Sequence, residues 1–154
     1  MAIPYYGQNK DGDMLDLTAD GKLKVKAGAG LPGAVDGAIS AADSGKIIFV
    51  DATSASGEVD IALPAPAEGL YFRFIVTEDT PTQDVKIVAT GAIVYGILMV
   101  QSDSNEDNSV VAAGSTNVLI KQAAKKGDWI EYISDGTSWF IRGNGSVQAA
   151  FTVS

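Results

Sequence analysis

The stretch Gly127-Asp-Trp-Ile-Glu-Tyr-Ile-Ser-Asp-Gly-Thr-Ser-Trp-Phe-Ile141 decides the fold class of this chain. Two runs rich in aromatic and β-branched residues flank Asp135-Gly136, a dipeptide that tolerates positive φ and favours a tight hairpin turn. A two-residue loop there pairs Tyr132 with Trp139 across the hairpin and Ile130 with Ile141. We expect these apolar pairs to lie in the core.

The opposite face of this hairpin mixes aromatic and charged side chains. The same loop pairs Trp129 with Arg142 and Glu131 with Phe140. Such a face suits a surface that another chain or the rest of this chain partly covers, so Trp129 and Phe140 are candidate partner-binding residues. Alternatively, Trp129 only covers the aliphatic stem of Arg142 on a free surface. Glu131 has no evident acidic partner, and we expect it on a solvated strand face.

Short β-branched and aromatic runs separated by turn residues continue on the N-terminal side of the hairpin and after it. No segment shows a 3.6-residue apolar period of helical length, so the sequence predicts an all-β protein. We expect a β-sandwich or jelly-roll-like body, because an open sheet of this many strands would leave long edges. The nine predicted strands are 46–51, 58–63, 69–76, 84–89, 92–100, 116–121, 128–134, 137–142 and 147–153.

The composition of the chain changes near residue 45. Residues 1–45 hold eight of the 17 glycines and only two of the aromatic residues. We therefore divide the chain into an extended N-terminal arm, 1–45, and a body, 46–154. Gly and Ala dominate residues 26–38, which predicts a flexible connector within the arm.

The arm contains a second predicted hairpin. A three-residue loop at 19–21 places Asp16 opposite Lys24 on one face and makes the other face apolar, with Leu15 against Val25 and Leu17 against Leu23. Two strands alone are marginal in water, so this apolar face must pack on its own body, a neighbouring subunit or another protein. The predicted partner-binding residues of the arm are Tyr5, Tyr6, Leu15, Leu17, Leu23 and Val25.

The composition also excludes several kinds of site. Cys and His are both absent, which removes thiol chemistry, the usual zinc sites and Ser-His or Cys-His catalysis. Residues 101–108 resemble the start of a calcium loop, but Asn108 stands where the turn glycine belongs, so an EF-hand is excluded. No acid pair or phosphate-binding loop is found. We therefore expect no catalytic, cofactor-binding or metal-binding residues.

Charge and hydropathy narrow the range of partners. The net charge is −8, the wrong sign for phosphates and anionic membranes, so we expect no nucleic-acid partner. The longest apolar run, 92–100, is too short to span a bilayer, and the N-terminus lacks the pattern of a secretory signal. We expect neither membrane insertion nor Sec export.

Four segments of the body together resemble a known class. The stretches 60–66, 69–76, 84–89 and 127–141 are similar to the small β-domains of tailed-bacteriophage structural proteins. The last stretch is the most telling: an aromatic strand, a Ser-Asp-Gly-Thr turn and a second strand that begins with Trp139. The resemblance implies a virion component, commonly a homotrimer, without catalytic activity.

The resemblance leaves two locations open. Fibre proteins of this class are usually long chains with a shaft or repeats, and neither is seen in these 154 residues. We therefore expect a capsid decoration (cement) protein that binds the major capsid protein on the head surface after synthesis in the host cytoplasm. The alternative is a tail-fibre or receptor-binding domain that binds carbohydrate through Trp129, Trp139 and residues 101–108.

Overall fold

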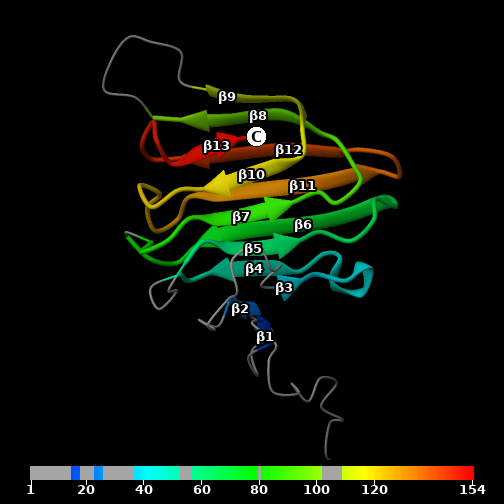
Figure 1. Ribbon diagram of the computed structural model, residues 1–154, viewed down its shortest axis with the longest axis horizontal. Helices are drawn as coiled ribbons and strands as arrows, with labels where there is room; N and C mark the ends of the chain where they lie inside the picture. The colour runs from blue at the N-terminus through cyan, green and yellow to red at the C-terminus, as the bar shows by residue number, and fades with distance from the viewer. Residues whose placement is uncertain (1–14, 18–22, 26–36, 53–56, 80, 102–108) are drawn as a thin grey trace, which may run out of the picture.

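The structure, a computed structural model, describes residues 15–17, 23–25, 37–52, 57–79, 81–101 and 109–154. It confirms the all-β prediction: two mixed sheets pack on each other as a β-sandwich. The strand axes of the two layers are nearly aligned, with strands pointing both ways along them and one layer over the other (Figure 1). The one helix among the described residues is a single 3-10 turn, η1, at Ala41–Asp43.

The larger sheet has eight strands in the order β1-β2-β4-β6-β11-β12-β8-β9. Three of its contacts are parallel: β2 with β4, β4 with β6, and β8 with β12. The strands are β1 Leu15–Leu17, β2 Leu23–Val25, β4 Ile47–Val50, β6 Glu68–Val76, β8 Val94–Val100, β9 Ser109–Ser115, β11 Trp129–Asp135 and β12 Trp139–Gly145.

The smaller sheet has five strands in the order β13-β10-β7-β5-β3. Strands β3, β5 and β7 are parallel to one another, whereas β10 is antiparallel to both β7 and β13. The strands are β3 Gly37–Ala38, β5 Val59–Ala62, β7 Val85–Val88, β10 Asn117–Ile120 and β13 Phe151–Val153.

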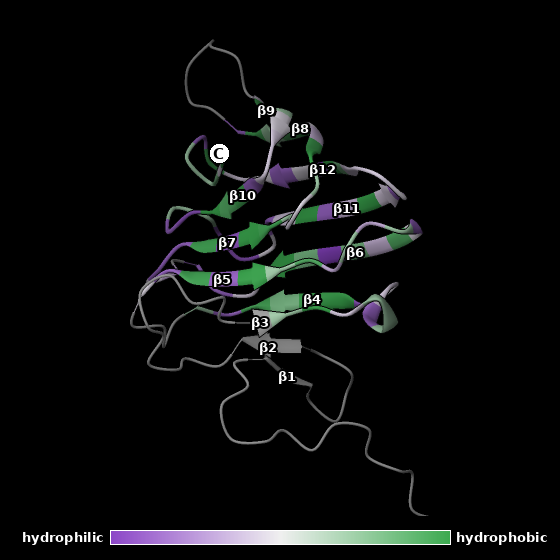
Figure 2. Cartoon of the chain, turned by 45° about the vertical axis from the view of Figure 1, so that its right-hand side comes forward, coloured by the Kyte–Doolittle hydropathy of each residue, from purple (hydrophilic) through white to green (hydrophobic). Residues whose placement is uncertain are grey.

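The core lies between the two sheets, where alternate residues of each strand point inward. Apolar residues run along the strands of both sheets, interrupted by polar ones on strands such as β6, β11 and β12 (Figure 2). The aromatic centre of the core is formed by Phe72, Phe74, Tyr132 and Trp139, all fully buried, with neighbouring ring centroids 5.7–6.1 Å apart. Burying each such side chain stabilises the fold by about 1.5–3 kcal/mol.

The hairpin of β11 and β12 has the predicted faces but not the predicted loop. Ser134 pairs with Trp139, and Tyr132 pairs with Ile141, so four residues rather than two form the connection. The carboxylate of Asp135 accepts hydrogen bonds from the backbone N–H groups of Thr137 and Ser138, which stabilises this longer turn. Because the register differs by two residues, every side chain keeps its face while its cross-strand partner changes.

All nine predicted strands overlap a strand of the body, and β6, β11 and β12 extend beyond the predicted ranges by one, one and three residues. Two strands were not predicted. β9 is rich in Ala and Gly and lacks the β-branched and aromatic density that marks a strand. β3 has only two residues, Gly37 and Ala38, within the segment assigned to the arm. The backbone register of β1 with β2 agrees with the predicted arm hairpin, and β2 also pairs with β4 at Leu23 and Ile48.

Candidate functional site

The candidate site is the outer face of the larger sheet, which consists of the outward side chains of β4, β6, β8, β9, β11 and β12. Strand pairing arranges these side chains in three rows across the sheet. The first row holds Tyr95, Phe140, Ile133 and Tyr71. The second holds Val111, Ile97, Arg142, Glu131, Arg73 and Ile47, and the third holds Met99, Asn144, Trp129, Ile75 and Phe49.

Large apolar side chains on this outer face are exposed to an unusual degree. Met99 is 55% exposed, Val111 is 54% exposed and Ile97 is 50% exposed, and all three lie on β8 and β9. Tyr95, Ile133, Phe140 and Ile47 are also exposed. Monomeric proteins rarely leave so many neighbouring apolar side chains exposed to water unless these residues form a binding surface.

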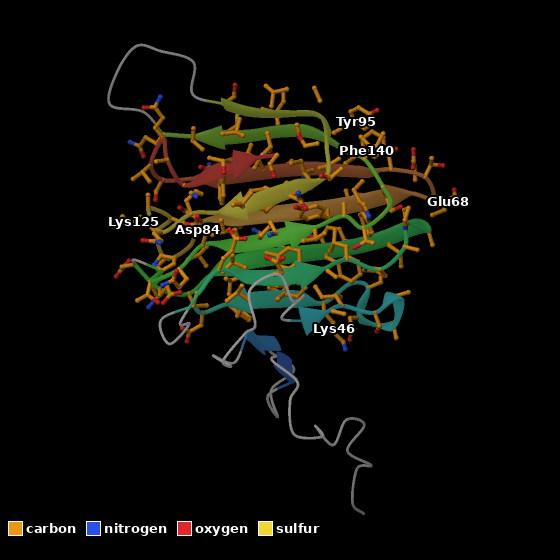
Figure 3. The ribbon with its side chains drawn as sticks, viewed as in Figure 1. Lys46, Glu68, Asp84, Tyr95, Lys125 and Phe140 are labelled. Atoms are coloured by element: carbon orange, nitrogen blue, oxygen red, sulfur yellow. The ribbon has the colours of Figure 1, made fainter. Side chains whose placement is uncertain are left out.

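Tyr95 and Phe140 form an aromatic pair on the first row. They are cross-strand partners on the parallel strands β8 and β12, with ring centroids 6.1 Å apart and planes tilted by 31°. Figure 3 shows the two side chains next to each other at one end of the sandwich. Exposed aromatic side chains with few rotatable bonds are frequent anchors of protein interfaces.

A charged cluster occupies the middle of the second row. Glu131 is only 5% exposed, and its carboxylate accepts hydrogen bonds from the Tyr71 hydroxyl at 2.7 Å and from Arg142 Nε at 2.5 Å. Nη1 of Arg73 lies 3.6 Å from the same carboxylate. The expectation that Glu131 lies on a solvated strand face is therefore wrong, because β6 and β12 place three donors over it.

The environment of Glu131 keeps its carboxylate ionised. Burial alone raises the pKa of Glu131, but the hydrogen bonds from Tyr71 and Arg142 and the charges of both arginines outweigh burial and lower the pKa. Burial and the bond to this carboxylate raise the pKa of the Tyr71 hydroxyl. A carboxylate held as an ion by two guanidinium groups suits a structural role better than proton transfer near neutral pH.

The two arginines of the cluster have different surroundings. The guanidinium of Arg73 lies 4.6 Å from the centroid of the Trp129 ring, a cation–π contact. The predicted register placed Trp129 against Arg142 on β12. In the structure Trp129 stacks instead with Arg73 on β6. The side chain of Arg142 is 70% exposed, so the donors that do not bind Glu131 face solvent.

The structure places two of the predicted partner-binding residues on this outer face. Trp129 is half-buried in the third row, and Phe140 is exposed in the first row. Tyr5 and Tyr6 lie outside the described residues. For Leu15, Leu17, Leu23 and Val25 the structure describes the backbone pairing and not the side chains.

Six exposed apolar residues of the site were missed by sequence reasoning, four on β8 and β9 together with Ile47 and Ile133. Tyr95, Ile97 and Met99 lie in a run that is apolar at nearly every position, so no alternation shows which residues point outward. Val111 lies on β9, which was not predicted as a strand. Every second residue of 94–100 is buried in the structure except Gly96, and this pattern could not be read from the sequence.

Residues with other possible chemistry form no second site in the part of the chain that the structure describes. Trp139, a candidate for binding carbohydrate, is fully buried in the core. Among the described residues, no group of three or more acidic side chains could hold a metal ion, and residues 102–108 fall outside them. In the same residues, no helix has the length and apolar character needed to cross a membrane.

Comparisons of this chain with models of protein families, with curated proteins and with solved structures found no match.

Proposed function

We propose that this chain is a non-enzymatic structural protein of a bacteriophage virion, namely a capsid decoration (cement) protein. It binds the major capsid protein on the outer surface of the head and acts there as a homotrimer. The observation that carries a binding role is the exposed apolar outer face of the larger sheet. The phage assignment rests on the resemblance of the body segments, above all 127–141.

The composition of the outer face supports protein binding. Protein interfaces are enriched in aromatic residues, Met and Arg and depleted of Lys, Glu and Asp. The three rows of the outer face present Tyr95, Phe140, Met99 and Arg142, and the one carboxylate in these rows, Glu131, is already neutralised by arginines. A structural protein that meets other protein surfaces needs such a face, whereas an enzyme would need a group free to transfer protons or to attack a substrate.

The arm completes the proposed attachment. Tyr5, Tyr6 and the apolar positions of the β1–β2 hairpin bind the capsid, and the body supplies a rigid base for them. Among the residues whose burial the structure describes, which begin at Gly37, the first member of the core is Ile39. A short arm of this kind lets a small domain cover part of a seam between capsid subunits at the cost of ordering its own chain.

The test uses capsids assembled from the major capsid protein of the same phage, without any decoration protein. The full chain should co-sediment with these capsids, appear on their outer surface in cryo-EM maps and raise their melting temperature. Absence of binding at micromolar concentration would overturn the proposal. Saturable binding to a glycan array without binding to capsids would favour the receptor-binding alternative.

A truncated chain and two point variants then locate the attachment. Deletion of residues 1–30 should keep the sandwich folded and abolish binding, and Leu17→Asp with Leu23→Asp should weaken binding at least 100-fold. Thr152→Asp, on the outside of the smaller sheet, is the matched control and should bind normally. If the truncated chain binds with unchanged affinity, the body makes the contact and the arm assignment is wrong.

A further inference from the structure

Two carboxylates lie side by side at one end of the larger sheet. Glu68, the first residue of β6, is the cross-strand partner of Asp135, the last residue of β11, and both are exposed. Within the described residues, neither carboxylate forms an ion pair. The Asp135 carboxylate accepts hydrogen bonds from the backbone N–H groups of Thr137 and Ser138, but these carry no full charge. Like charges on cross-strand partners repel, so this end of the sheet favours a cation from outside the chain.

The outer face of the larger sheet offers such a cation. Within the three rows, the two arginines, Arg73 and Arg142, outnumber the one glutamate, Glu131, so these rows are positive on a chain whose net charge is −8. Arg142 uses Nε for Glu131 and is 70% exposed, which leaves its terminal N–H groups able to bind a carboxylate in a bidentate pair.

Arg142 cannot reach the acidic end of its own sheet. It lies in the same row as Arg73, and Arg73 is five residues from Glu68 along β6, a distance of about 16 Å in an extended strand. A contact between Arg142 and these carboxylates therefore needs two molecules. The acidic end is visible in Figure 3, where Glu68 lies at the same end of the sandwich as Tyr95 and Phe140.

The exposed aromatic row lies between the two charged groups. Phe140 precedes Arg142 by two residues on β12, and Ile133 precedes Asp135 by two residues on β11. A neighbouring molecule that binds at Arg142 covers Phe140 and its partner Tyr95, which are 45% and 40% exposed, and one that binds at the acidic end covers Ile133, which is 41% exposed. Charge pairing and burial of apolar surface thus favour the same contact.

We infer that the outer face binds a second copy of this chain, with Arg142 of one copy against the Glu68–Asp135 end of the next. This inference rests on the proposed homotrimer, because a closed ring of three copies needs two different complementary surfaces on each copy. The contact buries the aromatic row and neutralises both carboxylates. The arm remains outside this contact and serves the capsid.

The first test is Glu68→Arg in the full chain, measured by light scattering across micromolar concentrations. The wild type should have the mass of three copies, and the variant should have the mass of one because the introduced guanidinium would meet Arg142 of its neighbour. Asp79→Arg is the matched control: it makes the same charge change at an exposed residue beyond the other end of β6, and it should stay trimeric. A trimeric Glu68→Arg variant would overturn the inference.

The second test separates the contact from the fold. Phe140→Ser should dissociate the trimer, and the far-UV circular dichroism spectrum of this variant should match that of the wild type. Leu119→Ser, on the outside of the smaller sheet, is the control and should stay trimeric. A trimeric Phe140→Ser variant overturns the inference and leaves capsid attachment unaffected. A wild-type chain that is monomeric at all concentrations measured overturns both the inference and the homotrimer. Whether the chain binds capsids is then decided by the capsid experiment alone.

Discussion

The two sheets of the sandwich have similar apolar inner faces and very different outer ones. Outside the larger sheet, large apolar residues such as Ile97, Met99 and Phe140 are exposed. Outside the smaller sheet, the outward residues of β5, β7, β10 and β13 are mostly short or polar, and none that the structure describes is an exposed large apolar residue. The inner faces explain stability, and only the larger sheet has an outer face suited to binding.

Both outer faces carry an ion cluster, and the clusters differ in burial. On the smaller sheet, Nζ of Lys86 lies 2.7 Å from Glu58 and 2.9 Å from Asp60, with the lysine and Glu58 partly in solvent. On the larger sheet, Glu131 is buried beneath Tyr71 and two arginines. Solvent screens the attraction between the charges of the Lys86 cluster. In the Glu131 cluster, loss of one partner leaves a charge that water solvates poorly.

The largest expected effect comes from breaking the larger sheet at Gly96. This residue has φ of +138°, and a Cβ there would lie 2.0 Å from the carbonyl oxygen of Ile141 on the neighbouring strand β12. Gly96→Ala should lower the free energy of unfolding by about 3–4 kcal/mol or more, or prevent folding. Chemical denaturation measures the change. Gly57→Ala, with open space around its Cβ, should change it by no more than about 0.5 kcal/mol.

The next effect compares the two ion clusters. Glu131→Gln should lower the free energy of unfolding by about 2–3 kcal/mol, because it leaves two guanidinium groups without a buried anion. Asp60→Asn should lower the free energy of unfolding by only about 0–1 kcal/mol, because Lys86 still pairs with Glu58 and remains partly in contact with solvent. Urea denaturation of both variants measures the difference. Equal losses would show that burial does not separate the two clusters.

The smallest effect is a pH dependence that has opposite directions in the two clusters. The lowered pKa of Glu131 means that its contribution to stability is present above its ordinary value of 4.5 and is lost as the pH falls through the lowered pKa. Hydrogen bonds to Glu58 and Asp60 raise the pKa of Lys86, so its contribution is present below 10.5 and is lost above the raised pKa. Melting temperatures from about pH 3 to about pH 11 should show both losses.

A variant identifies the source of the acid loss. Glu131→Gln has no carboxylate to protonate at this position, so the stability difference between it and the wild type should narrow below pH 4.5. A difference that stays constant down to about pH 3 would mean that Glu131 does not contribute to the acid loss.

Much of the body was predictable because its strands carry their own signal. The predicted strands 69–76 and 128–134 agree with β6 and β11 to within one residue at each end, and the structure buries Ile130 and Tyr132 as expected. The faces of the β11–β12 hairpin were also predicted, although the loop is longer, since Asp135 caps the backbone of the turn rather than starting a two-residue loop. A register shift of two residues leaves each side chain on the same face of the sheet, so the predicted loop gave the wrong cross-strand partners but the right faces.

The candidate site was predictable only in part, and for a different reason. Trp129 and Phe140 were identified because they share a strand face with charged residues in one local hairpin. The burial of Glu131 depends on Tyr71, which is 60 residues away in the sequence and reaches it only because β6 pairs with β11. No local pattern gives that pairing.

The sequence by itself determined the all-β class, most strand positions, the absence of Cys and His chemistry and the acidic net charge, because these depend on composition and on the two-residue period of a strand. Only the tertiary structure decided which residues of the apolar run 92–100 face solvent and which strands lie beside one another. Strand order is set by contacts between distant segments. The outer face of the larger sheet, with its exposed aromatic row and its buried carboxylate, exists only once those contacts form.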